Sequence, residues 1–350
     1  MAPSDQRVDP VLAVEDLTVR IATRRGPAHV VNGVSWSVGA GETLAIVGES
    51  GSGKSVSVLS LLGLVPRPPA TVTGTATFDG QDLIALPEEA LQKVRGPGIG
   101  MVFQDPMTSL NPVLTVGRQL TEGMEVHLGY DRGRAQERAV ELLDLVGIPS
   151  PRERLRAYPH HLSGGMRQRV MIAIALSCDP TVLVADEATT ALDVTIQAQI
   201  VELIGDLQRE LGMAVVWITH DLGVVAGIAD RVAVMYAGRI VEEAAVDALY
   251  ASPQHPYTRG LLASLPVLGA AGGRRSDLAV IPGLPPDPVH LPPGCPFHPR
   301  CPVRGDARCA DQVPPLRTVG ETTGTAPHRV ATFYDPDAPA DEAPIEDGST

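Results

Sequence analysis

The stretch GESGSGKS, from Gly48 to Ser55, has the residue types and spacing of a loop that binds nucleotide phosphates. Its glycines let backbone N–H groups approach a β-phosphate, and the helix expected after it favours negative charge at its N-terminus. We expect Lys54 to reach the β- and γ-phosphates and the Ser55 hydroxyl to bind Mg²⁺. The residues expected to contact nucleotide in this phosphate loop are Gly48, Glu49, Ser50, Gly51, Ser52, Gly53, Lys54, Ser55 and Val56.

Two adjacent acids, Asp186 and Glu187, follow the apolar run TVLVA. An isolated acidic pair of this kind would most simply cap a strand. In a chain with a phosphate loop, Asp186 is instead suited to hold Mg²⁺, and Glu187 is suited to be the general base for an attacking water.

These residues require a scaffold that alternates strands and helices. Continuous apolar runs predict buried parallel strands at 43–48, 181–186 and 214–219, and an alternating pattern predicts a strand at 11–20. Helical spacing is seen at 56–64, 131–148 and 194–212, with Gly212 as a C-cap, and a hairpin is expected to turn at Gly238. The sequence therefore predicts an α/β domain with a parallel sheet, and a helical subdomain at about 105–180.

Composition changes near both ends of the 350-residue chain. We expect a flexible N-terminus at 1–10, an irregular extension at 252–334, where nine prolines fall within 282–302, and an acidic disordered tail at 335–350. The net charge of −13 argues against nonspecific binding to nucleic acid. The N-terminus is not a signal peptide, and no apolar run is long enough to cross a membrane. Four cysteines fit a reducing cytosol better than a disulfide framework.

Four further segments give the chain a family resemblance. HLSGGMRQRV (161–170) lies between the phosphate loop and the acidic pair, Gln104 lies in MVFQDP, TALD spans 190–193, and His220 ends VWITH. Together with the phosphate loop, this order resembles the ATP-binding-cassette (ABC) ATPases over roughly residues 11–245. The resemblance implies an ABC ATPase domain at 11–251, with a RecA-like core and with antiparallel β and helical subdomains.

The resemblance also implies a division of roles. Catalytic roles fall to Lys54, Gln104, Glu187 and His220, and Mg²⁺ would be held by Ser55, Gln104 and Asp186. ATP would lie between two ATPase subunits, so that Ser163, Gly164, Gly165 and Asp193 contact the nucleotide of the partner. A helix N-terminus capped by Ser163 suits this task, because its first N–H groups lack internal partners.

Two departures from the family pattern affect these expectations. The stretch TRRGPAHVV (23–31) lacks the aromatic residue that commonly stacks on adenine, so Arg24 or Arg25 could stack a guanidinium group there instead. Ala188 stands where a proline usually follows the acids, which should soften the turn but leave Glu187 in place.

The segments at 100–117, 191–200 and 255–266, with the Pro-rich 281–301, look like the ATPase subunits of dipeptide/oligopeptide importers. Val56 and the sequence GGM make the chain similar to the first of the two paired subunits. The implied machine has a second homologous ATPase subunit, two membrane permeases and an extracytoplasmic binding protein, and the chain would lie peripherally at the cytoplasmic face of the membrane. Import of nickel, glutathione or another small solute is an alternative, as is a soluble ABC ATPase that acts on nucleic acid, which the acidic charge disfavours.

The extension contains three of the four cysteines, Cys295, Cys301 and Cys309. Their spacing is not that of a zinc ribbon. The resemblance implies a [4Fe–4S] cluster, which normally takes four thiolates, but Thr332 stands where the fourth cysteine is expected. Three interpretations stay open: a cluster completed by His298, His328 or a carboxylate; a zinc site of three cysteines and one histidine; or thiols without metal. Cys178 is expected to be a small buried hydrophobe.

Overall fold

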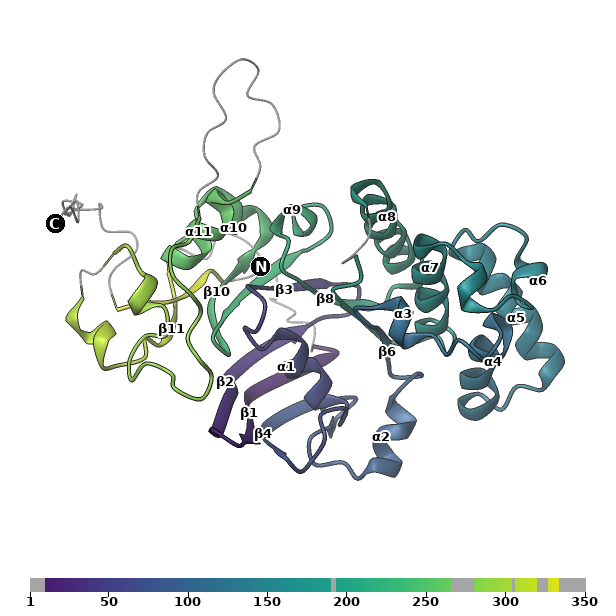
Figure 1. The fold of residues 1–350 in the computed structure, drawn as a ribbon, viewed down its shortest axis with the longest axis horizontal. Helices are drawn as coiled ribbons and strands as arrows, with labels where there is room; N and C mark the ends of the chain where they lie inside the picture. Colours follow the sequence, from purple (N-terminus) through teal and green to yellow (C-terminus); the bar gives the residue numbers. More distant parts are fainter. Residues whose placement is uncertain (1–9, 190–192, 266–279, 304–305, 320–326, 334–350) are drawn as a thin grey trace, which may run out of the picture.

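In the computed structural model, residues 10–189, 193–265, 280–303, 306–319 and 327–333 are described (Figure 1). The acidic tail at 335–350 and residues 1–9 of the predicted flexible N-terminus lie outside them. Within the described residues, no helix is long and apolar enough to cross a bilayer.

The central layer is an eight-stranded sheet in the order β11-β12-β10-β9-β3-β8-β7-β6. The five strands from β9 to β6 pair in parallel, whereas β10, β12 and β11 pair antiparallel. The strands are β3 (Thr43–Val47), β6 (Ile99–Val102), β7 (Val182–Asp186), β8 (Ala214–Thr219), β9 (Arg231–Tyr236), β10 (Arg239–Ala245), β11 (Leu316–Thr318) and β12 (Arg329–Ala331). The predicted α/β class with a parallel sheet is confirmed.

The parallel register explains where the chemistry gathers. Every residue of β3, β7 and β8 is buried, as expected for apolar runs inside a covered parallel sheet. Val47 pairs with Thr219, and Asp186 pairs with Ile218. The carboxyl ends of these strands therefore meet at one edge, which is where open α/β sheets bind ligands.

A smaller antiparallel sheet packs on this core, in the order β2-β1-β4-β5. Its strands are β1 (Leu12–Thr23), β2 (Gly26–Val38), β4 (Ala70–Phe78) and β5 (Gln81–Asp82). Inward side chains such as Leu17 and Val34 share one hydrophobic cluster with Leu44 and Ile46 of β3 and with Leu61 of the first helix. This cluster fixes the phosphate loop between the two sheets.

The helices fall into groups along the chain. The long amphipathic helix predicted at 194–212 is present and ends at Gly212, whose φ of 66° suits glycine. Helices α3 to α7 gather at one end of the molecule, at the right of Figure 1, around buried residues that include Leu120 and Leu143. The helices are α1 (Lys54–Leu61), α2 (Glu88–Val94), α3 (Pro106–Ser109), α4 (Val116–His127), α5 (Arg132–Leu145), α6 (Pro151–Arg154), α7 (Gly164–Ala175), α8 (Val194–Leu211), α9 (Leu222–Val225), α10 (Val246–Ala251) and α11 (Pro256–Ala263), with short 3₁₀ turns η1 (Pro159–His161), η2 (His298–Arg300) and η3 (Ala307–Ala310).

The C-terminal extension lies at the opposite end from the helical group (Figure 1). Beyond α11, its described residues form short 3₁₀ turns and irregular segments, and they add β11 and β12 to the central sheet. Two buried carboxylates secure this junction: Glu242 lies 2.7 Å from His328 Nε2, and Glu243 pairs with Arg329. The extension is therefore joined directly to the ATPase core.

Candidate functional site

The phosphate loop connects β3 to α1 and takes a conformation that only glycine adopts easily. Gly53 is the N-cap of α1 with φ 99°, and an added Cβ there would lie 2.4 Å from the carbonyl oxygen of Val30. At Gly48 an added Cβ would lie 2.1 Å from the carbonyl oxygen of Met235. The loop is thus packed against β2 and β9, and the N-terminus of α1 points toward its interior. Ser50 and Gly51 are its exposed tip, while Val56 lies in the first turn of α1.

Lys54 is buried and its ammonium group turns back into the loop. Its Nζ donates to the carbonyl oxygens of Gly48 at 2.8 Å and Glu49 at 3.0 Å. Burial lowers the pKa of Lys54, and the nearby charges of Glu187, Asp186 and Glu49 oppose that shift. A cation surrounded by carbonyl oxygens at the N-terminus of a helix is suited to receive phosphate oxygens.

Ser55 and Asp186 form the second part of the site. Ser55 Oγ donates to Asp186 Oδ1 at 2.8 Å, which joins α1 to the end of β7. Burial raises the pKa of Asp186, and the hydrogen bond from Ser55 opposes that rise. A hydroxyl and a carboxylate oxygen in contact, with the carboxylate buried, form a donor set that fits Mg²⁺.

Glu187 lies between two side chains that arrive from distant segments. Gln104 Nε2 donates to Glu187 Oε2 at 2.7 Å, and His220 Nδ1 lies 3.5 Å from Glu187 Oε1. Glu187 itself has φ 46°, an uncommon backbone state for a residue with a side chain. Its N–H donates to the carbonyl oxygen of Ile218 at 2.9 Å, which anchors this turn to β8. The structure thus brings Gln104, Glu187 and His220 together beside the phosphate loop.

The residues expected to act in trans lie elsewhere on the molecule. Ser163 caps α7, where its Oγ accepts from Met166 N at 3.3 Å, and Asp193 caps α8 in the same way through Ile196 N at 3.0 Å. Gly164 and Gly165 open α7, which lies in the helical group rather than beside α1 (Figure 1). Of the segment 190–193, only Asp193 is within the described residues. Ser163 and Asp193 are both exposed, so another molecule can reach them.

The stretch expected to face adenine is mostly strand. Residues 26–31 belong to β2, and the β1–β2 hairpin turns at Arg24 and Arg25. Arg25 forms an ion pair with Asp287 of the extension, and His29 N donates to the carbonyl oxygen of Pro288 at 2.8 Å. Both arginines are exposed, and stacking of one of them on a base stays a prediction.

The cysteine segment does not form a metal site in the structure. No group of three or more potential metal ligands is found among the described residues, which include all four cysteines. Cys295 is buried and its N–H donates to the carbonyl oxygen of Cys309 at 2.9 Å, while Cys301 Sγ contacts the carbonyl oxygen of Val303 at 3.0 Å. His328 is bound to Glu242 instead. The side chains present do not fit a [4Fe–4S] cluster or a zinc ion, and packing accounts for the thiols, as it does for buried Cys178.

Two contacts of the phosphate loop were missed from the sequence. Arg300 of the extension pairs with Glu49 at 2.7 Å, and the Tyr257 hydroxyl accepts from Glu49 N at 2.9 Å. Both partners lie more than 200 residues from the loop, and no local spacing signals such a contact. The segments that contain them, 255–266 and 281–301, carry the family resemblance, but that resemblance does not indicate a contact with the loop.

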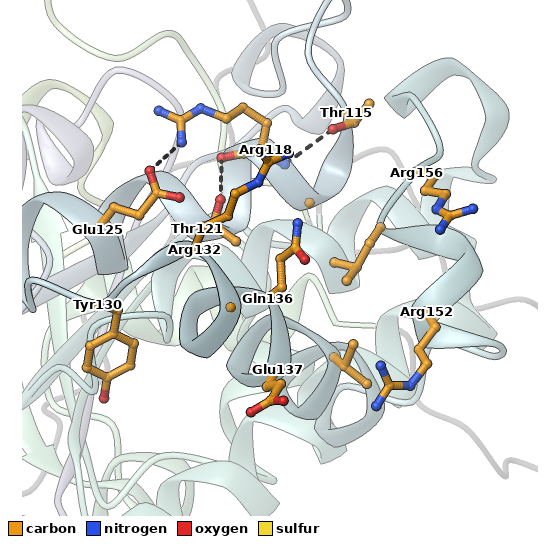
Figure 2. Close-up of a pocket in the computed structure, with 14 residues that line it drawn as sticks. Thr115, Arg118, Thr121, Glu125, Tyr130, Arg132, Gln136, Glu137, Arg152 and Arg156 are labelled. Atoms are coloured by element: carbon orange, nitrogen blue, oxygen red, sulfur yellow. Dashed lines mark hydrogen bonds and ion pairs between the residues drawn. The ribbon is translucent and has the colours of Figure 1, made fainter.

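A separate cavity of about 1240 Å³ lies in the helical group, between α4, α5 and α6. Figure 2 shows Arg118 and Glu125 at one side of it and Arg152 and Arg156 at the other. Arg118 Nη1 pairs with Glu125 at 2.6 Å, and the remaining charged residues of the lining are Arg132, Arg152, Arg156 and Glu137, so the lining keeps a net positive charge. None of the described site residues lines this cavity, so it is distinct from the phosphate loop.

The chain is similar to known proteins in both sequence and structure. Residues 31–190 match the family model described as "ABC transporter", and residues 241–309 match the model described as "Oligopeptide/dipeptide transporter, C-terminal region". The oligopeptide transport ATP-binding protein OppD of Bacillus subtilis (strain 168) is 50% identical over 340 residues, which cover 97% of this chain and 93% of OppD. The dipeptide transport ATP-binding protein DppD of the same organism is 50% identical over 319 residues, which cover 91% of this chain and 94% of DppD.

Among solved structures, the fold is similar to the dimeric structure of MJ0796, a bacterial ABC transporter cassette. The TM-score is 0.60 at 28% identity, over 67% of this chain and 98% of the cassette. A post-hydrolysis state of the same cassette, bound to ADP and Pi, gives a TM-score of 0.58 at 29% identity, with the same coverage.

Proposed function

The chain belongs to the ABC transporter family as an ATP-binding, ATP-hydrolysing subunit, and we propose that it drives the import of dipeptides or oligopeptides. The observation that carries the ATPase is the contact of Glu187 with Gln104 and His220, next to a phosphate loop whose Ser55 binds Asp186. The peptide cargo is supported by the relatives named OppD and DppD, which match almost the whole chain.

The reaction assigns a separate task to each side chain. Backbone N–H groups of the loop and Lys54 bind the β- and γ-phosphates, and Glu187 accepts the proton of the water that attacks the γ-phosphate. His220 and Gln104 orient the Glu187 carboxylate. Mg²⁺ would be held by Ser55 and Asp186, with Gln104 as a further oxygen donor, and when bound it neutralises charge on the β- and γ-phosphates.

The working unit is a pair of ATPase subunits. The Ser163 end of α7 is exposed, and a helix N-terminus can bind a phosphate presented by another molecule. We assign Ser163, Gly164, Gly165 and Asp193 to the nucleotide of the partner subunit. The partner is a second, homologous ATPase subunit, since the GGM sequence and Val56 resemble the first subunit of such pairs.

The membrane partners are two permease subunits, served by an extracytoplasmic solute-binding protein. The arginine-lined cavity between α4, α5 and α6 supports permease docking at the helical group (Figure 2). The segment from Gln104 to α4 exposes Met107 and Val113 and links this face to Glu187. The chain would thus lie peripherally at the cytoplasmic face of the membrane, with no nucleic-acid partner.

The test is transport by the assembled complex. The chain is co-expressed with the second ATPase subunit and the two permeases proposed above, and the complex is reconstituted in proteoliposomes with the binding protein. ATP-dependent uptake of a labelled dipeptide or oligopeptide supports the proposal, and a complex that carries Glu187→Gln should show none. If ATP is hydrolysed but only nickel or glutathione is taken up, the peptide assignment is wrong.

A further inference from the structure

Arg300 of the C-terminal extension reaches the phosphate loop through a two-pronged contact. Its Nη1 donates to Glu49 Oε2 at 2.7 Å, and its Nη2 donates to Glu49 Oε1 at 3.0 Å. The two residues are 251 positions apart in the sequence. Paired N–H donors that meet both oxygens of one carboxylate give the strongest and most directional of the ordinary ion-pair geometries.

The extension fixes the guanidinium group of Arg300 on its other side. Arg300 Nε donates to the carbonyl oxygen of Pro282 at 3.0 Å, and Nη2 also donates to that of Ile281 at 3.2 Å. The Tyr236 hydroxyl on β9 lies 3.3 Å from Nη1. The Arg300 side chain is only 5% exposed, whereas that of Glu49 is 28% exposed. The buried arginine is therefore the fixed member of the pair, and Glu49 is the member whose position it sets.

Glu49 connects this contact to the catalytic lysine. Its carbonyl oxygen accepts from Lys54 Nζ at 3.0 Å, and its N–H donates to the Tyr257 hydroxyl at 2.9 Å. The Glu49 carboxylate is also close enough to Lys54 to act on its pKa. A carboxylate at this position repels a bound triphosphate unless a cation neutralises it. Arg300 supplies that cation.

The position of Arg300 depends on the cysteine segment (294–309). Arg300 lies between Cys295 and Cys301, and the Cys295 N–H closes the segment onto the carbonyl oxygen of Cys309. Phe297 anchors it, with its ring 5.2 Å from that of Tyr236 and 5.4 Å from that of Tyr257. The same aromatic cluster thus lies under the extension and beside the phosphate loop.

We propose that Arg300 is a positioning residue for the ATPase reaction, which it serves by neutralising and orienting Glu49. The extension thereby sets the affinity of the phosphate loop for MgATP within the same chain. This inference rests on the proposed function, because it concerns the nucleotide site of that reaction. The inference also gives the cysteine segment a role that requires no metal, which is to hold Arg300 in position.

The test compares single and double variants of the purified chain by MgATP binding and steady-state hydrolysis. Arg300→Gln should raise the Kd and KM for MgATP about tenfold, while kcat changes less than about threefold, since the charge acts on binding. In a Glu49→Gln background, Arg300→Gln should change the Kd and KM for MgATP by less than about threefold, because no carboxylate remains to be neutralised. Arg300→Lys keeps the positive charge but cannot donate to both oxygens of the carboxylate at once, so its Kd and KM should lie between those of the unmodified chain and of Arg300→Gln. Arg308→Gln is the matched control, since Arg308 pairs with Asp306 inside the extension.

Each outcome decides between the two proposals. If Arg300→Gln behaves like Arg308→Gln, or if its effect is the same in both Glu49 backgrounds, Arg300 does not position the loop. If Arg300→Gln does not fold, the Arg300→Lys protein takes its place in the same comparison, and an unchanged Kd overturns the inference. If the unmodified chain does not bind MgATP at all, the proposed function itself fails.

Discussion

Gln104 Nε2 donates a 2.7 Å hydrogen bond to Glu187 Oε2 across 83 residues of sequence. Gln104 follows β6 and leads into the helical group, whereas Glu187 directly follows β7 in the ATPase core. A shift of the helical group would therefore displace the amide that donates to this carboxylate. This relationship joins the proposed permease-docking face to the chemistry.

Glu187→Gln should abolish turnover while leaving the nucleotide site intact. An amide cannot accept the proton of the attacking water, so we expect phosphate release to fall by about 10²- to 10⁴-fold. MgATP binding should persist, and the ATP-bound pair of ATPase subunits should accumulate on gel filtration. Glu202→Gln, on an exposed position of α8, is the control. Unchanged turnover in Glu187→Gln would remove this residue from the role of base.

Ser55→Ala should weaken the response to Mg²⁺ more than the binding of nucleotide alone. The change removes the hydroxyl that contacts Asp186 at 2.8 Å, and with it one of the oxygen ligands proposed for Mg²⁺. We expect the Mg²⁺ concentration for half-maximal ATPase activity to rise about tenfold. Ser60→Ala is the control, since Ser60 lies on the same helix and its hydroxyl donates to the carbonyl oxygen of Ser57, away from Asp186. Equal Mg²⁺ titrations for the two variants would contradict the assignment.

Sequence reasoning could place most of the core of this site because its parts are local. The phosphate loop follows β3, Asp186 and Glu187 lie at and just after the end of β7, and His220 follows β8. Parallel pairing must bring the carboxyl ends of these strands to one edge. The hydrophobic periods that mark these strands and α8 are strong signals.

The contacts of the extension could not be predicted in the same way. Proline density at 282–302 excludes regular helix but does not say where an irregular chain packs. Arg300 reaches Glu49 because Phe297 packs the cysteine segment against Tyr236 and Tyr257. Packing of this kind leaves no periodic pattern in the sequence. The expectation of a metal site came from the family resemblance and from the grouping of three cysteines in the sequence, and the structure places His328 on Glu242 instead.

Gly53 and Gly51 offer a matched test of the loop's packing. Both have positive φ, but an added Cβ at Gly53 lies 2.4 Å from the carbonyl oxygen of Val30, whereas at Gly51 nothing lies within 4 Å. Gly51→Ala should cost only backbone strain, about 1–2 kcal/mol of unfolding free energy. Gly53→Ala should cost about 2 kcal/mol more because the loop or β2 must move. Denaturant unfolding without nucleotide measures both values, and equal losses would contradict the packing described for Gly53.

His255 gives the chain a pH-dependent stability that can be isolated by one substitution. The residue is buried at the start of α11, where its Nδ1 accepts from Tyr257 N at 3.1 Å, which requires an unprotonated Nδ1. Burial lowers the pKa of His255 to about 4; Glu242, whose carboxylate accepts from His255 N, opposes this shift, and Arg259 adds to it. An unfolded histidine, with a pKa near 6.5, takes up its proton first on acidification.

The native state is therefore expected to lose stability as pH falls from about 6.5 to about 4, by up to roughly 3 kcal/mol from this residue. Other groups titrate in the same range, so the informative quantity is the difference from His255→Asn. Asparagine can accept the same N-cap hydrogen bond but does not titrate. Over this range, the unfolding free energy of His255→Asn should fall less than that of the unmodified chain, so the two values should converge at low pH. If the unfolding free energy of His255→Asn runs parallel to that of the unmodified chain across this range, His255 is not the buried neutral group that the structure describes.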